Sequence, residues 1–403
     1  MILFEIKKVF SKSINKLTLL ILIVLLIAVS ILTINKVEYV DENGNNSTGI
    51  IAAKKLRDAK NKWAGYITED VLIKVIKENT KINTSKEALS KDYQENDKAY
   101  SKMQGFLGIS GIISDAFGKY DDYDYYRVNS VATKEVGKLY EKRILNFKEW
   151  LNSGEENFSL SEKNFLINKY EQLKTPFYYE YVDGWNVLLQ NISTFILILA
   201  LVISVFVAGI FSDEFQLKAD SIFFSTKLGR NKAIRSKIGA GLLIITVAYV
   251  IFTGLYTMIV LSVLGFDGAK CPIQFSMWKS IYNITYFQAY LLIVLGGYVG
   301  TLFAMTLCMI VSAKTHSTVI AIIVPFIILC GLPFLSRIIT LPQICSAFPD
   351  QLLQVYVNIK EFVLYDIGGI IIDSVSIIIP VYMIASIILQ PVIYSIYKRS
   401  EVK

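Results

Sequence analysis

The sequence has few of the residues on which metal sites, histidine-based catalysis and disulfide scaffolds depend. Its single histidine, His316, leaves almost no basis for a histidine metal cluster or a serine–histidine–aspartate triad. None of its four cysteines lies in the long polar segment 36–186, so this segment is not a disulfide scaffold. A Cys271–Cys345 bridge stays open, because spacing alone cannot decide it.

Charge is scarce as well, at 19% of 403 residues against 53% hydrophobic residues and a mean hydropathy of +0.47. This balance argues against an ordinary soluble enzyme. The Walker A pattern, the glycine-rich dinucleotide fingerprint, H-E-x-x-H and G-x-S-x-G are all missing. We therefore predict that the chain is not an enzyme, holds no cofactor or metal of its own and hydrolyses no ATP by itself.

Six apolar blocks are long enough to cross a bilayer as helices, and none contains Asp, Glu, Lys or Arg. They predict an all-α polytopic membrane protein with spans at 17–34, 187–211, 238–264, 287–312, 318–335 and 374–397. We interpret the first block as an uncleaved anchor and not a signal peptide, because its apolar run continues as far as Ile34.

Lysine and arginine gather before the first span, between the second and third, and after the sixth. By the positive-inside rule, this predicts a multi-pass protein of the cell membrane with both termini in the cytoplasm. The net charge of +7 thus bears on topology and not on nucleic acid. Residues 35–186 then form an extracellular, mainly helical domain. Within it, the apolar and glycine-rich stretch 105–113 is interpreted as a buried turn, the alternative being a segment that dips towards lipid or substrate.

Two predicted cytoplasmic segments have amphipathic patterns. Residues 1–16 place apolar side chains on one face and lysines elsewhere, which predicts an interfacial helix along the inner leaflet. Residues 212–237 are mixed in charge and contain the apolar patch Ile222, Phe223 and Phe224, which predicts a loop that docks on a partner. The alternative is a loop lying on anionic headgroups.

Together, the basic interfacial helix, the six spans and a loop with the acidic Glu214 just after span two resemble the ABC-2-type permeases. The loop ending Ser225-Thr-Lys-Leu-Gly-Arg230, followed by Arg235 and Lys237, is similar to that family's pattern. The resemblance covers 1–35 and 187–403, whereas many members lack the long domain between spans one and two.

The resemblance implies a separate cytosolic ABC ATPase that carries the ATP, and a second permease protomer, identical or not, in the same bilayer. It also implies short re-entrant external helices within 340–372. The ATPase-coupling residues that it implies are Glu214, Phe223, Phe224, Lys227, Gly229, Arg230, Arg235 and Lys237.

We therefore expect a permease subunit of an ATP-driven exporter whose cargo is amphipathic or apolar, such as a peptide antibiotic or a lipid. The alternative is a membrane sensor or scaffold with an external ligand-binding domain, which would need no ATPase. Gly296 and Gly300 form a small-xxx-small face for helix packing. That packing is expected inside one bundle, and a dimer seam is the alternative.

Overall fold

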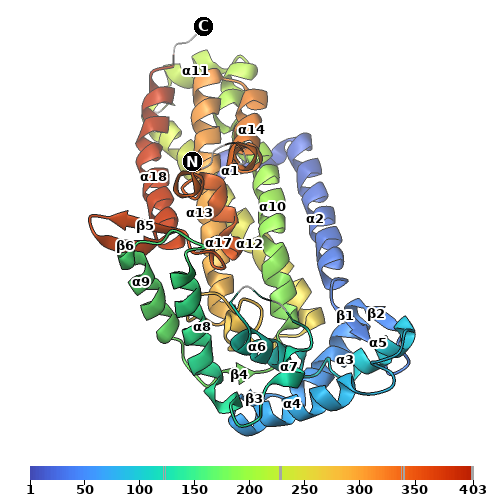
Figure 1. Ribbon diagram of the computed structural model, residues 1–403. Helices are drawn as coiled ribbons and strands as arrows, with labels where there is room; N and C mark the ends of the chain where they lie inside the picture. Colours follow the sequence, from blue (N-terminus) through green and yellow to red (C-terminus); the bar gives the residue numbers. More distant parts are fainter. Residues whose placement is uncertain (121, 123, 227–228, 337, 339–340, 401–403) are drawn as a thin grey trace.

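The computed structural model describes residues 1–120, 122, 124–226, 229–336, 338 and 341–400 (Figure 1). It contains six helical segments long and apolar enough to cross a membrane, which confirms the helical, multi-pass class. These are α2 (Ser13–Ile34), α10 (Asp183–Gln216), α12 (Ile234–Leu264) preceded by the π-helical turn η2 (Gly229–Ala233), α13 (Tyr286–Thr315), α14 (Thr318–Phe326) continued by η4 (Ile327–Gly331) and α15 (Leu332–Ser336), and α18 (Ser374–Lys398).

α10 and α13 are the most buried spans and form the centre of the bundle, with α2, α12, α14 and α18 around them. The outer helices keep many apolar side chains exposed, as a lipid-facing surface requires. In the fifth span, Pro325 supplies no backbone N–H to the helix, and the chain passes into the wider turn η4 two residues later.

The insertion, which we define as the chain between α2 and α10, is mainly helical. Its helices are α3 (Gly49–Asn61), α4 (Glu69–Asn83), α5 (Tyr93–Ser101), α6 (Leu107–Phe117), α7 (Arg127–Ser130), η1 (Val136–Lys138), α8 (Leu139–Ser153) and α9 (Leu160–Glu171). Two antiparallel pairs accompany them: β1 (Glu38–Val40) with β2 (Asn46–Thr48), and β3 (Gly65–Tyr66) with β4 (Tyr178–Tyr179).

The stretch 105–113 is not the buried turn that we expected. Most of it belongs to α6, whose Ile109, Ile112 and Ile113 are buried against α4 and α8. Side chains at these spacings share one helical face, and burying them outweighs the low helix propensity of the glycines.

The insertion packs on the connections between the spans at one end of the bundle (Figure 1). From the α12–α13 connection, which contains η3 (Ile273–Phe275), the ring of Trp278 lies 6.4 Å from that of Phe177. The guanidinium of Arg143 lies 5.0 Å from the same Trp278 ring. Leu364, in the strand β5 (Leu364–Ile367), belongs to the same apolar core as residues of α8 and α9. The insertion is therefore joined to the bundle by packed side chains as well as by its two chain ends.

The segment after α15, for which short helices were predicted within 340–372, combines three short helices with a hairpin that was not predicted. It contains α16 (Pro342–Cys345), η5 (Pro349–Leu353) and α17 (Val355–Asn358), and then the hairpin of β5 with β6 (Ile370–Asp373). Gly368 and Gly369 form its turn with φ of +63° and +88°, values that favour glycine. No disulfide joins Cys271 to Cys345 in the described part of the chain.

Gly296 and Gly300 of α13 face η5 and α17, not another span. A Cβ on Gly296 would lie 2.6 Å from Cγ2 of Val355 and 2.9 Å from the carbonyl oxygen of Leu352. A Cβ on Gly300 would lie 2.6 Å from Cδ1 of Leu353. The small-residue face therefore lets a non-spanning segment approach α13 closely.

Candidate functional site

The segment between α10 and α12 lies at the end of the bundle opposite the insertion (Figure 1). It contains the short helix α11 (Asp220–Ser225) and η2. The C-terminus of α18 is at the same end, because Arg230 in η2 bonds to its last residues. We call this the α11 end. The predicted coupling residues lie here, except Lys227, which is outside the described residues.

The N-terminal helix α1 (Ile2–Ser11) packs against α10 and α12 at this end. Val9 is buried, and the ring of Phe10 lies 5.4 Å from that of Phe206. The helix is shorter than the predicted 1–16, because the backbone is extended at Lys12 and α2 starts at Ser13. The side-chain amide of Asn15 donates to the carbonyl of Val9 at 2.7 Å and so bridges the break.

An ion-pair cluster joins α1 to α10 and α12. Its members are Glu5, Lys8, Lys12, Asp213, Glu214 and Lys237. At its centre, the fully buried Lys237 Nζ lies 2.8 Å from Oε1 of Glu214 and 3.0 Å from Oε2 of Glu5, and it donates to the carbonyl of Ile210 at 2.8 Å. A buried ammonium group is stable only with such partners.

The two other ammonium groups of the cluster come from the N-terminal segment. Lys8 also pairs with Glu214, and Lys12 pairs with Asp213. Burial by itself lowers the pKa of Lys8, but the hydrogen bond and charge of Glu214 outweigh it, so this pKa lies above its ordinary value. Three ammonium groups thus face three carboxylates, and α1 is fixed to the ends of two spans.

Aromatic side chains extend this link to α18. The Tyr397 hydroxyl lies 3.4 Å from Oε2 of Glu214, and its ring lies 5.4 Å from Phe224 and 6.0 Å from Phe223. The predicted apolar patch is therefore divided. Phe223 and Phe224 point into the protein, whereas Ile222 is 70% exposed.

The remaining predicted residues connect the loop to the C-terminal helix. Nη1 of Arg230 donates to the carbonyl of Lys398 at 2.7 Å, and the guanidinium lies 4.7 Å from the ring of Phe224. A cation at the C-terminus of a helix is favourable because the last carbonyls have no partner in the helix. Arg235 lies 5.7 Å from the ring of Tyr394. Gly229 cannot be replaced without movement, because a Cβ there would lie 1.9 Å from the carbonyl oxygen of Phe223.

Sequence reasoning selected Glu214 and Lys237 but missed their partners Glu5 and Lys8, and also the adjacent pair of Lys12 with Asp213. One signal was present: Asp213 and Glu214 directly follow an apolar span, and Lys8 and Lys12 precede another. The described residues contain no group of three His, Cys, Asp or Glu side chains that could hold a metal ion. The charged side chains of this end instead pair with one another and join α1 to α10 and α12.

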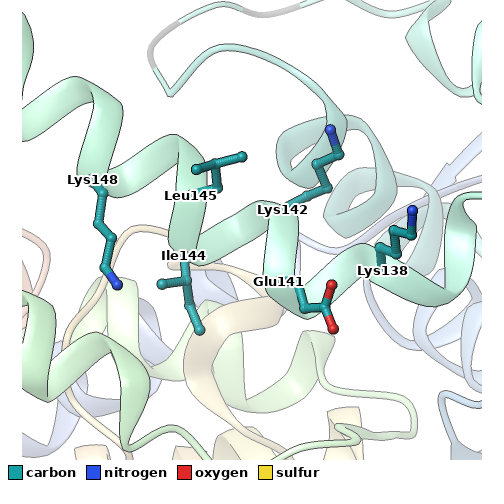
Figure 2. A pocket seen from close by; sticks show the side chains of 6 residues that line it. All are labelled: Lys138, Glu141, Lys142, Ile144, Leu145 and Lys148. Atoms are coloured by element: carbon teal, nitrogen blue, oxygen red, sulfur yellow. The ribbon is translucent and has the colours of Figure 1, made fainter.

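A separate groove of about 400 Å³ runs along α8 on the insertion (Figure 2). It is lined by Lys138, Glu141, Lys142, Ile144, Leu145 and Lys148. All six come from α8 and the turn before it, and Figure 2 shows them along one helix. The groove is thus an open helix face and not an enclosed site.

No protein-family profile, curated protein or solved structure matches the chain.

Proposed function

We propose that the chain is the permease subunit of an ATP-binding cassette exporter. In this proposal a separate cytosolic ATPase docks at the α11 end, both termini are cytoplasmic, and the insertion lies outside the cell. The observation that carries the proposal is the connection of the loop to α1, α10, α12 and α18 through the ion-pair cluster and the rings around Tyr397. A displacement of α11 by a partner would reach all four helices.

Two features of the sequence support a separate source of energy. The six apolar blocks contain no Asp, Glu, Lys, Arg or His, and the chain has no Walker A pattern. Transport driven by an ion gradient usually needs ionisable groups at bilayer depth. ATP-driven closure of two ATPase subunits on two permease protomers would instead shift the spans between two arrangements. The largely apolar bundle suits an amphipathic or apolar cargo.

The test is to purify the chain from its native membrane, identify the bound subunits, and reconstitute it in liposomes with and without the ATPase. We expect an ABC ATPase to co-purify and cargo movement to require ATP. Accumulation of cargo by the chain alone on a proton or sodium gradient would contradict the proposal. A stable protein with no ATPase partner would favour the sensor or scaffold instead.

The exposed side chains of α11 give a sharper prediction. Ile222→Asp should reduce co-purification of the ATPase about tenfold, because an apolar anchor in an interface often contributes this much. The amount of permease in the membrane should stay the same, since Ile222 is 70% exposed. Leu89→Asp is the matched control, because Leu89 is 72% exposed on the insertion. Equal co-purification of both variants with the native chain would contradict docking at Ile222.

Arg230 should act on coupling and not on assembly. Arg230→Glu removes the bond to the Lys398 carbonyl and places a carboxylate beside it. We expect cargo transport to fall at least about tenfold, while ATPase co-purification changes less than about twofold. Arg230→Lys, which keeps the charge, should retain more transport. Unchanged transport by Arg230→Glu would remove Arg230 from the coupling path.

A further inference from the structure

A cavity of about 270 Å³ lies between α10 and the segment formed by η5 and α17. Ser193 and Thr194 of α10, Leu329 of η4, and Asp350 and Tyr356 of the non-spanning segment are among the residues that line it. The cavity is too small for a whole amphipathic molecule, but it can take a polar headgroup with the first carbons of its chain.

Among the described residues that line this cavity, Asp350 is the one carboxylate, and it is 1% exposed. Its Oδ2 accepts from the side-chain amide of Gln351 at 3.0 Å, whereas its Oδ1 has no hydrogen-bond partner among the described residues. Ser193 Oγ, on the α10 side of the cavity, also has none. No Lys or Arg of the described chain forms an ion pair with Asp350. Buried polar atoms are normally satisfied, so unpaired atoms on two sides of one cavity indicate a ligand.

From this geometry we propose that the cavity binds the ammonium headgroup of an amphipathic molecule, with Asp350 as its counter-ion. An ammonium group supplies the positive charge and the N–H donors that Oδ1 of Asp350 and Oγ of Ser193 lack. Leu197 and Leu329 provide apolar contacts for the adjoining carbons. Binding of an ammonium headgroup in this cavity needs no ATPase. The inference rests on the proposed function only where it identifies this ligand with the transported cargo.

The charge state of Asp350 gives the site a pH dependence. Burial raises its pKa to about 6. An alkylammonium group stays protonated far above this value, so binding should be strong at pH 8 and weaken as pH falls through 6 and the carboxylate is protonated. The titratable groups nearby are Tyr356 of α17, with Lys360 Nζ 4.0 Å from its ring, and Tyr382 of α18. The residues of α10 and η4 that line the cavity are uncharged, and α13 meets η5 at Gly296 and Gly300.

The test is photolabelling of the purified full chain in maltoside detergent with a dodecylammonium that carries a diazirine in its chain. We expect labelled peptides from residues 190–197 and 350–357 at pH 8. Asp350→Asn should reduce this labelling about tenfold, as the loss of a charge-assisted hydrogen bond implies. Asp350→Glu should keep most of it. Glu361→Gln, which removes an exposed carboxylate from the chain just after α17, is the matched control and should change nothing.

The same probe with a hydroxyl headgroup should label the native chain as weakly as the ammonium probe labels Asp350→Asn. If Asp350→Asn fails to fold, Thr194→Trp fills the cavity from its exposed rim and should block labelling. Competition in nanodiscs identifies the source of the headgroup: an ethanolamine phospholipid competes if it is a membrane lipid, and only unlabelled dodecylammonium competes if it is a free amphiphile. Equal labelling of Asp350→Asn and the native chain, or by both probes, overturns the proposal. Absence of an ATPase partner would overturn only the proposed function.

Discussion

Lys237→Ala is expected to lower the free energy of unfolding by about 3–5 kcal/mol, the effect of breaking a buried ion pair by removing one partner. Lys237 is fully buried and contacts Glu214, Glu5 and the carbonyl of Ile210. Without its ammonium group, Glu214 keeps Lys8 and the Tyr397 hydroxyl, Glu5 loses its ion-pair partner in the cluster, and the Ile210 carbonyl loses a donor. Thermal unfolding of the purified variant in detergent measures the change.

Two further variants make this prediction specific. Lys237→Ala combined with Glu214→Leu should recover part of the loss, because the more buried of the two carboxylates that pair with Lys237 is then removed, and only Glu5 is left without its central partner. Lys16→Ala removes an exposed lysine just after the cluster and should change stability by less than about 0.5 kcal/mol. If Lys237→Ala were as stable as Lys16→Ala, the cluster would not hold the α11 end together.

Gly296→Val is expected to destabilise the protein by about 1–3 kcal/mol through overpacking. The first added carbon would already lie 2.9 Å from the carbonyl oxygen of Leu352, a backbone atom that moves only if η5 moves. Because η5 also holds Asp350, photolabelling by the ammonium probe should fall in the same variant.

Gly254→Val on α12 is the matched control, because nothing lies within 4 Å of a Cβ at Gly254. Gly254→Val also replaces glycine by a residue of higher helix propensity, so this control should leave the stability of the protein unchanged or raise it slightly. Equal stability of the two variants would show that η5 adjusts freely, and the close approach of α13 would then have no energetic role.

The spans could be predicted because the bilayer imposes a length and an absence of charge that a local window of sequence can detect. Their ends could not. α10 continues five residues beyond its apolar block to Gln216, since Asp213 and Glu214 are neutralised by lysines about two hundred residues away. The turn expected at 105–113 became α6 for a similar reason, because its partner faces come from α4 and α8.

The candidate site shows the same limit. Glu214, Arg230 and Lys237 stand out in the sequence as charges beside apolar spans, but their partners do not. Arg230 bonds to a backbone carbonyl of Lys398, an acceptor that no side-chain pattern reveals. Asp350 was passed over altogether, because one acid in a loop has no signature until burial and an unpaired oxygen set it apart.

The packing of the insertion against the α12–α13 connection and the β5–β6 hairpin has a consequence for how motion could be observed. A region held by Trp278, Leu364 and the Lys60–Asp183 ion pair cannot swing freely on its two chain ends. A tilt of α12, α13 or α18 would therefore move the insertion together with these helices. A small change in the angle of a helix within the bundle would then produce a larger displacement at the outer surface of the insertion. A spin label at Tyr93, which is 87% exposed on α5, would report such rocking.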